Sequence, residues 1–341
     1  MVKKKRHHYI PRFYLKRFSV NNEGKFLGLY NLNNRKFIQN APLKSQAYEN
    51  FLYGEDDEIE NALADLEGKV AQMFYYWTEE KLLYPPPLES NGFKVFQRFI
   101  LYQIFRTPKM GKQLLDSLNV TAEKMLREFK PNLWKQFKGH RIENDSIVLF
   151  ALLHSAGKEN LLDHLEFKFV VNLSDLPFIT SDSPVILYNQ LLEKTDSYVG
   201  ATALVAKGLQ IFYPIHPRLM ICLFDSQVYE CDKESINCAS TEDIRDIYQL
   251  NALQYINCDS QLFFDDSFEE RYFSFLSEDF DQYRNINRSF SNAIPVDNRK
   301  FVSIENEDPH IDLKLSFFKT IVDIDMYKNK SSMWRDYSKS R

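Results

Sequence analysis

Asp57–Trp77 reads DEIENALADLEGKVAQMFYYW, and its apolar side chains recur every three or four residues. This period predicts an amphipathic helix over residues 57–77. The same pattern, bounded by prolines, predicts further helices at 92–107, 110–129 and 145–164. A short helix is also predicted to begin at Pro11. The first half of the chain is therefore predicted to be mainly helical.

After His164 the pattern changes to strand. Short runs rich in β-branched and aromatic residues predict strands at 167–171, 177–180, 185–188, 209–215 and 219–224. A hairpin is predicted over residues 25–37. Helix returns at 241–258, with Thr241 as its N-cap, and an acidic stretch at 265–281 predicts a peripheral helix.

The order of elements along the chain is helices, then strands, then helices again. This order predicts an α+β fold in which a helical layer packs on a small, mainly antiparallel β-sheet. One domain is predicted over residues 1–300, followed by a C-terminal extension at 301–341.

Composition narrows the classes of protein. The 341 residues are 44% hydrophobic and 26% charged, which is typical of a folded globular protein. A net charge of -4 argues against a polycation that coats nucleic acid or an acidic membrane, so any anion site must be local. No apolar run approaches the roughly 20 residues that span a bilayer, which predicts a cytoplasmic protein with no membrane partner. The four cysteines form no C-x-x-C pair and are predicted to be reduced rather than bound to zinc.

The segment His7–Phe18, HHYIPRFYLKRF, resembles the opening signature of the domain of unknown function 4238 family. Further similarities follow in family order at Glu60, Glu67, Gln103–Pro108, Phe178–Val185, 213–218 and 250–254. In this chain Ser183 stands where the family usually has asparagine, and His216 where it has a small polar residue. The resemblance covers about residues 5–260 and implies no activity, because the family name records none.

The N-terminal segment combines histidines and cations ahead of a helix start. His7, His8 and Arg12 suit an anion pocket, because a helix N-terminus and positive charges both favour a phosphate or carboxylate. For Lys3–Arg6 the alternative is a solvated basic arm. Adjacent histidines point in different directions, so at most one of the pair serves the site.

Glu60 and Glu67 share a helix face but lie about 10 Å apart along the axis, too far to bind one metal. They are predicted either to hold Arg or His partners or to form a plain salt bridge. Gln103 and Arg106 fall on or beside the buried side of their helix. A buried arginine needs a partner, and the candidates are Glu60, Glu67, Asp182 or a ligand phosphate.

Asp182 lies in a Ser-Asp-Ser-Pro turn between two strand-like runs. Its carboxylate is either a reacting group presented at a strand end or a structural acceptor of backbone N–H groups.

Three hypotheses for function follow. The leading one is a hydrolase, in its first version a nuclease, with His8 and Asp182 catalytic and with His7, Arg12, Gln103 and Arg106 binding an anionic substrate. In the second, the same residues form a non-catalytic nucleotide- or RNA-binding module of a larger bacterial system. In the third they are a buried polar network that fixes the packing. No metal or cofactor is assigned, and the oligomeric state is left open.

Overall fold

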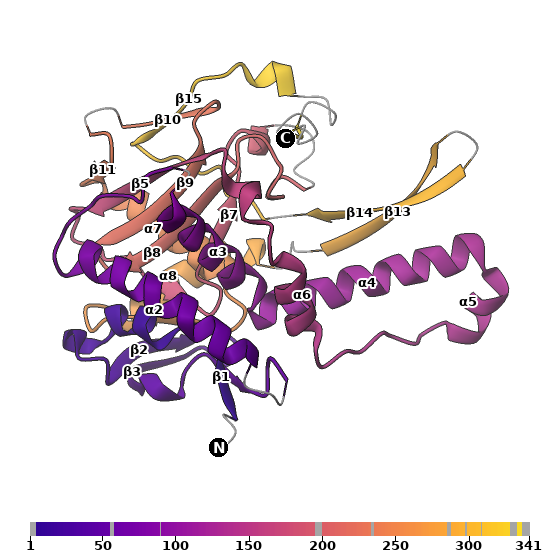
Figure 1. Cartoon of the computed structure of the whole chain (residues 1–341), viewed down its shortest axis with the longest axis horizontal. Coiled ribbons are helices and arrows are strands. Elements are labelled where there is room, and N and C mark those ends of the chain that lie inside the picture. Colours follow the sequence, from indigo (N-terminus) through magenta and orange to yellow (C-terminus); the bar gives the residue numbers. More distant parts are fainter. Residues whose placement is uncertain are drawn as a thin grey trace.

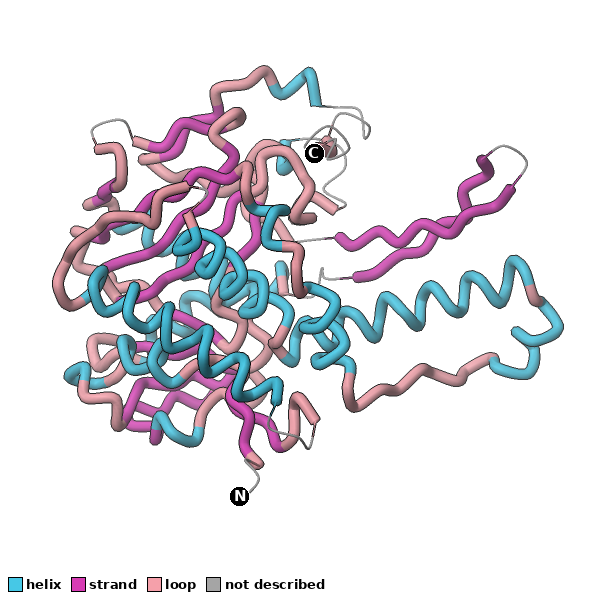
Figure 2. Tube along the Cα trace, viewed as in Figure 1, coloured by secondary structure: helices cyan, strands magenta, loops and turns pink. Residues whose placement is uncertain are grey.

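The computed structural model describes residues 5–54, 58–88, 90–194, 200–232, 235–284, 288–296, 299–307, 309–327 and 333–335. Figure 1 shows a body of helices packed on sheets, from which one long helix and a hairpin project, and Figure 2 shows how these elements are distributed. Lys3, Lys4 and Asp57 lie outside the described residues.

The described helices follow the predicted order. Their bounds are α1 Arg12–Leu15, α2 Glu58–Thr78, α3 Asn91–Phe105, α4 Pro108–Phe129, α5 Pro131–Phe137, α6 Ile147–Ser155, α7 Ile244–Asn257 and α8 Glu270–Phe280. Short 3-10 turns lie at Lys16–Phe18, Val20–Asn22, Leu43–Ser45, Glu159–Leu162, Leu192–Lys194, Asp281–Tyr283 and Ile324–Tyr327.

A five-stranded sheet forms the centre, in the order β11-β5-β9-β8-β7, and only the β11–β5 pair is parallel. Its strands are β5 Leu165–Asn172, β7 Ile186–Tyr188, β8 Gln210–His216, β9 Leu219–Asp225 and β11 Cys238–Thr241. Successive side chains of a strand face opposite sides of the sheet, and in this sheet the side chains on both faces are apolar. In β9, Ile221 packs into the cluster that contains α2 and α3, and Cys222 packs into the cluster that contains α7.

The helical layer meets the sheet through aromatic rings. On α2, the Trp77 ring lies 5.8 Å from Phe96 of α3, and 5.8 and 5.2 Å from Phe167 and Phe169 of β5. These contacts confirm the predicted α+β fold with helices on a mainly antiparallel sheet.

Smaller sheets complete the body. One has the order β3-β2-β12-β6, and β1 pairs with β4 and β10 with β15. The strands are β1 Arg6–His8, β2 Phe26–Asn31, β3 Lys36–Pro42, β4 Tyr48–Asn50, β6 Thr180–Ser181, β10 Tyr229–Cys231, β12 Gln261–Phe264 and β15 Phe318–Thr320. The hairpin predicted at 25–37 is confirmed by the β2–β3 pair.

The projecting arm consists of α4 and α5, with a hairpin of β13 Arg288–Val296 and β14 Arg299–Glu307 lying along α4 (Figure 1). The N-terminus of α4 is stabilised by Thr107, which caps it by accepting a hydrogen bond from Met110 N, and by Pro108 in the first turn. Sequence periodicity predicted this helix but neither its projection nor the hairpin beside it.

Four predictions about elements were wrong in detail. The strand expected over 177–180 is β6, which covers only Thr180–Ser181. The helix expected over 145–164 covers only Ile147–Ser155, because the backbone becomes extended at Ala156 (φ -60°, ψ 135°) and turns at Gly157, which has a positive φ of 75°. The N-cap of α7 is Asp243 rather than Thr241, and its carboxylate accepts from Arg245 N. Residues 6–8, expected to lead directly into a helix, form the strand β1.

Candidate functional site

The two N-terminal histidines differ in environment. His7 is 1% exposed; its Nδ1 accepts a hydrogen bond from Tyr53 N at 3.1 Å, and its ring stacks on that of Tyr53 with 5.4 Å between centroids. These contacts hold β1 against the chain that follows β4. His7 therefore has a packing role in the structure.

His8 is half-buried and forms a backbone hydrogen bond with Lys44. Its Nε2 is buried and has no hydrogen-bond partner among the described residues. Burial lowers the pKa of His8, and the charges of Arg12, Arg6 and Arg106 lower it further. The ring is therefore neutral near pH 7. Arg12 beside it is exposed.

Gln103, Arg106 and Glu67 form a buried chain of hydrogen bonds between α3 and α2. Arg106 is 1% exposed and donates to the Glu67 carboxylate at 2.6 Å and, through two nitrogens, to Gln103 Oε1. Gln103 Nε2 donates in turn to Tyr9 O at 3.0 Å. Of the partners proposed for Arg106, the structure thus selects Glu67.

Glu60 lies on the same helix as Glu67. Burial raises the pKa of Tyr53, and the Glu67 and Glu60 carboxylates raise it further, whereas Arg106 acts in the opposite direction. Both glutamates therefore act on the same tyrosine hydroxyl, beside the arginine.

Asp182 follows β6 and is 2% exposed. Its carboxylate accepts from the backbone N–H groups of Asp259, Ser260 and Gln261 at 2.8, 2.7 and 2.8 Å, and from the Ser260 hydroxyl at 3.0 Å. Burial raises the pKa of Asp182, and the hydrogen bonds from Asp259 and Ser260 oppose that shift. These contacts correspond to the structural alternative for an aspartate in a turn.

The predicted site residues therefore form two neighbouring groups. The first consists of Arg106 with Glu67 and Gln103, and the charge of Arg106 acts on His8. The second is the turn of Asp182, whose carboxylate adds to the rise that burial causes in the pKa of Tyr9. Neither of the two cavities described below is lined by His8, Arg12, Arg106 or Asp182.

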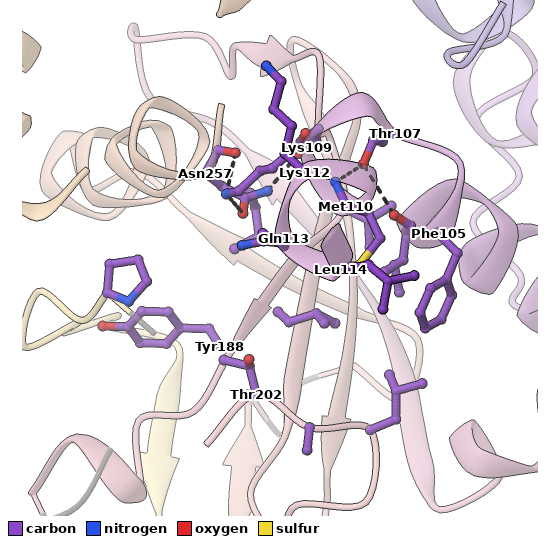
Figure 3. Close-up of a pocket in the computed structure, with 18 of the residues that line it drawn as sticks. Phe105, Thr107, Lys109, Met110, Lys112, Gln113, Leu114, Tyr188, Thr202 and Asn257 are labelled. Carbon is purple, nitrogen blue, oxygen red and sulfur yellow. Dashed lines mark hydrogen bonds between the residues drawn. The ribbon is translucent and has the colours of Figure 1, made fainter. Parts of the chain in front are cut away.

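The better-formed cavity, of about 560 Å³, lies between α4, β7 and α7 (Figure 3). Most of its wall is apolar, and this part is lined by Ile104, Phe105, Met110, Leu114, Val185, Ile186, Leu187, Leu204, Leu253 and Ile256. Polar and small residues complete the lining: Gln103, Thr107, Lys109, Lys112, Gln113, Asp116, Ser117, Ser183, Tyr188, Gly200, Thr202, Ala203, Asn257 and Pro309. A volume of this size is typical of small-molecule sites.

Lysines and a hydroxyl gather on one part of the cavity wall. Lys109 Nζ donates to the backbone oxygen and to Oδ1 of Asn257, each at 2.6 Å (Figure 3). Asn257 Nδ2 donates in turn to Ser183 O at 2.8 Å. Lys112 pairs with Asp259 at 2.6 Å. Ser183 is 5% exposed, and its Oγ has no partner among the described residues.

A second, more open hollow, also of about 560 Å³, lies beside the Asp182 turn. It is lined by Tyr9, Ser45, Ala47, Tyr48, Glu49, Asn50, Ser260 and Gln261. Within the described ranges, no three His, Cys, Asp or Glu side chains lie close enough together to hold a metal ion. All four cysteines carry free thiols, and Cys222 is buried.

Sequence reasoning missed the first cavity. Gln103–Pro108 and Phe178–Val185 were identified as similar segments, but nothing in either run indicates that they meet across a cavity with α7.

Comparisons with known proteins agree with the resemblance. Among the described residues, no helix has the length and apolar character needed to cross a membrane. No curated protein and no solved structure is significantly similar to the chain. A family model described as "Protein of unknown function (DUF4238)" matches residues 6–268, which is most of the chain. The protein therefore belongs to the DUF4238 family.

Proposed function

We propose that this protein binds a small anionic ligand of nucleotide size in the cavity between α4, β7 and α7. One observation carries the proposal: the buried hydroxyl of Ser183, without a partner among the described residues, on a wall that also carries the Lys109 ammonium. A buried polar group without a partner is costly, so a ligand that accepts or donates a hydrogen bond there gains affinity.

The lining indicates the class of ligand. The apolar wall suits a flat or hydrophobic body such as a base, and the cationic part suits a phosphate or carboxylate. Among the described residues that line the cavity there is no histidine and one carboxylate, Asp116, which is already paired with Arg141 at 3.2 Å. Binding without turnover therefore has more support at this cavity than hydrolysis does.

The test is thermal denaturation of the full chain with nucleoside mono- and triphosphates, and with inorganic phosphate alone. Binding at a concentration of about 100 times Kd adds about 2.7 kcal/mol of stability, which raises Tm measurably. Thr202→Trp should abolish this rise by filling the cavity, and Ser183→Ala should weaken binding about fivefold or more through loss of one hydrogen bond.

Lys94→Met is the matched control for Lys109→Met. Lys94 is exposed on α3 and does not line the cavity, so only Lys109→Met should reduce the ligand-induced rise. The proposal fails if none of the nucleotides raises the Tm of the wild type, or if Thr202→Trp responds to them as the wild type does.

A second candidate is a phosphodiester hydrolase centred on His8, and one observation supports it. His8 combines a pKa that burial lowers with a buried Nε2 that has no described partner, and the charges of three arginines also act on its ring. A neutral imidazole suits a general base, and guanidinium charges suit developing negative charge.

His8→Gln tests this candidate, because glutamine keeps a polar side chain but cannot transfer the proton. Wild type and variant are compared on RNA, DNA and nucleotide substrates, with and without divalent metal. General-base catalysis predicts a rate lower by about 100-fold or more in the variant. Equal rates, or no product from the wild type, would remove His8 from consideration as a base.

A further inference from the structure

The end of the projecting arm carries an unusual surface, here called the arm tip and defined as residues 129–141, FKPNLWKQFKGHR. It contains three lysines and one arginine but no acidic residue, although the whole chain has a net charge of -4. Figure 1 places α5, the centre of the arm tip, at the end of α4 farthest from the body. The 22 residues of α4 extend over about 33 Å at 1.5 Å per residue.

Large side chains are exposed on the arm tip. Phe129, Leu133 and Phe137 are 42%, 42% and 50% exposed. Trp134 is half-buried, and the Arg127 guanidinium lies over its ring at 4.6 Å. A solvated helix end has no need of such rings, so they indicate a surface that a partner covers.

The lysines of the arm tip have no described acidic partner. Lys130, Lys135 and Lys138 are exposed, and no ion pair is recorded for them within the described ranges. Arg141, by contrast, pairs with Asp116 of α4. Three cations of the arm tip are therefore open to an external anion.

We propose that the arm tip binds single-stranded nucleic acid, with the three lysines on the phosphates and the rings of Phe129 and Phe137 stacked on bases. Cations that follow a backbone, interleaved with aromatic rings that accept any base, are the two elements of such sites. The single exposed aliphatic residue, Leu133, and the predominance of rings favour bases over lipid tails as the apolar partner. This site is separate from the cavity and does not depend on its ligand.

The test is fluorescence anisotropy of the full chain with labelled RNA and DNA strands of about 12 nucleotides, and with the corresponding duplexes. Three phosphate contacts predict a slope of about -2 for the logarithm of the binding constant against that of salt, or about 20-fold weaker binding between about 50 and 200 mM salt. Replacing both rings, Phe129→Ala and Phe137→Ala, should weaken binding by about fivefold or more per ring.

The decisive variant replaces Lys130, Lys135 and Lys138 with glutamate, and it should abolish binding. Its matched control replaces three exposed lysines of the body with glutamate and changes the net charge equally: Lys36, Lys69 and Lys94. Circular dichroism checks that both proteins fold. If the glutamate triple variant does not fold, the same three lysines are replaced with glutamine instead. Thr202→Trp should leave oligonucleotide binding unchanged.

Three results would overturn the proposal. The first is no binding to either single strand. The second is equal loss of binding in the arm-tip variant and its control. The third is that the arm tip binds a different partner and no oligonucleotide. That partner would be phosphatidylglycerol vesicles, bound through the arm tip, or a second copy of the chain, whose association the two phenylalanine substitutions abolish. If the single strands bind, comparison of the RNA and DNA affinities shows which sugar the site prefers.

Discussion

Removing the carboxylate of Glu67 should destabilise the fold strongly, because it leaves a buried guanidinium without its charge partner. Arg106 is 1% exposed, and its other described acceptor is the neutral Gln103 Oε1. Breaking a buried ion pair from one side costs about 3–5 kcal/mol. The Glu67 side chain is 24% exposed, so water can partly replace it, and we expect Glu67→Ala to cost about 3 kcal/mol.

A double-mutant cycle separates the charge effect from lost packing. Arg106→Met removes the buried charge and keeps much of the side-chain volume. In the double variant no unpaired charge is left. Its loss of unfolding free energy should therefore be about 2 kcal/mol smaller than the sum of the losses in the two single variants. Urea unfolding followed by circular dichroism and tryptophan fluorescence gives the free energy of unfolding of each variant.

Glu123→Ala is the matched control, because the Glu123–Arg127 pair is exposed, with 47% and 54% of the two side chains accessible. It should cost less than about 1 kcal/mol. The reasoning is refuted if Glu67→Ala costs no more than this control, or if the costs of Glu67→Ala and Arg106→Met add to within about 0.5 kcal/mol.

Three further predictions concern pH, packing and buried charge. Burial, with the charge of Arg335, lowers the pKa of His164 from 6.5 to about 4. The stability that this neutral ring contributes is therefore complete above pH 6.5 and is lost as the pH falls toward 4. The loss is at most about 3 kcal/mol. His164→Gln should flatten the pH dependence of urea unfolding between these two pH values. Gly28→Ala should lower the free energy of unfolding by about 2–3 kcal/mol, because its Cβ would lie 2.1 Å from the Phe264 ring; an unchanged urea midpoint would contradict this. Lys168→Met should cost about 3 kcal/mol in the same assay, since the buried ammonium satisfies three backbone carbonyls.

Local patterns predicted the elements well where apolar residues recur with a clear period or form a short β-rich run. The apolar spacing of residues 57–77 predicted α2 to within one residue at each end, and the β-rich runs at 167–171 and 219–224 became β5 and β9. Pattern fails where the chain turns: apolar residues continue beyond Gly157, but the backbone is extended at Ala156 and has a positive φ at Gly157, so the helix ends at Ser155.

Site residues were predicted less completely, because their partners lie far away in the sequence. The buried helix face indicated that Arg106 needs a partner, but only packing of α2 on α3 selects Glu67 among the candidates. Asp182 could not be assigned from its turn, since the three N–H groups that it accepts come from residues 259–261.

The amino-acid sequence alone determined the order of helices and strands, their buried faces and membership of the DUF4238 family. It did so because hydrophobic period and turn chemistry act within a few residues along the chain. Tertiary structure alone decided that Ser183, Lys109 and Asn257 meet at one cavity, and that α4 carries its basic, aromatic end away from the body. The physical reason is that these arrangements depend on how separate elements pack against one another, and no local pattern records which distant surface an element will meet.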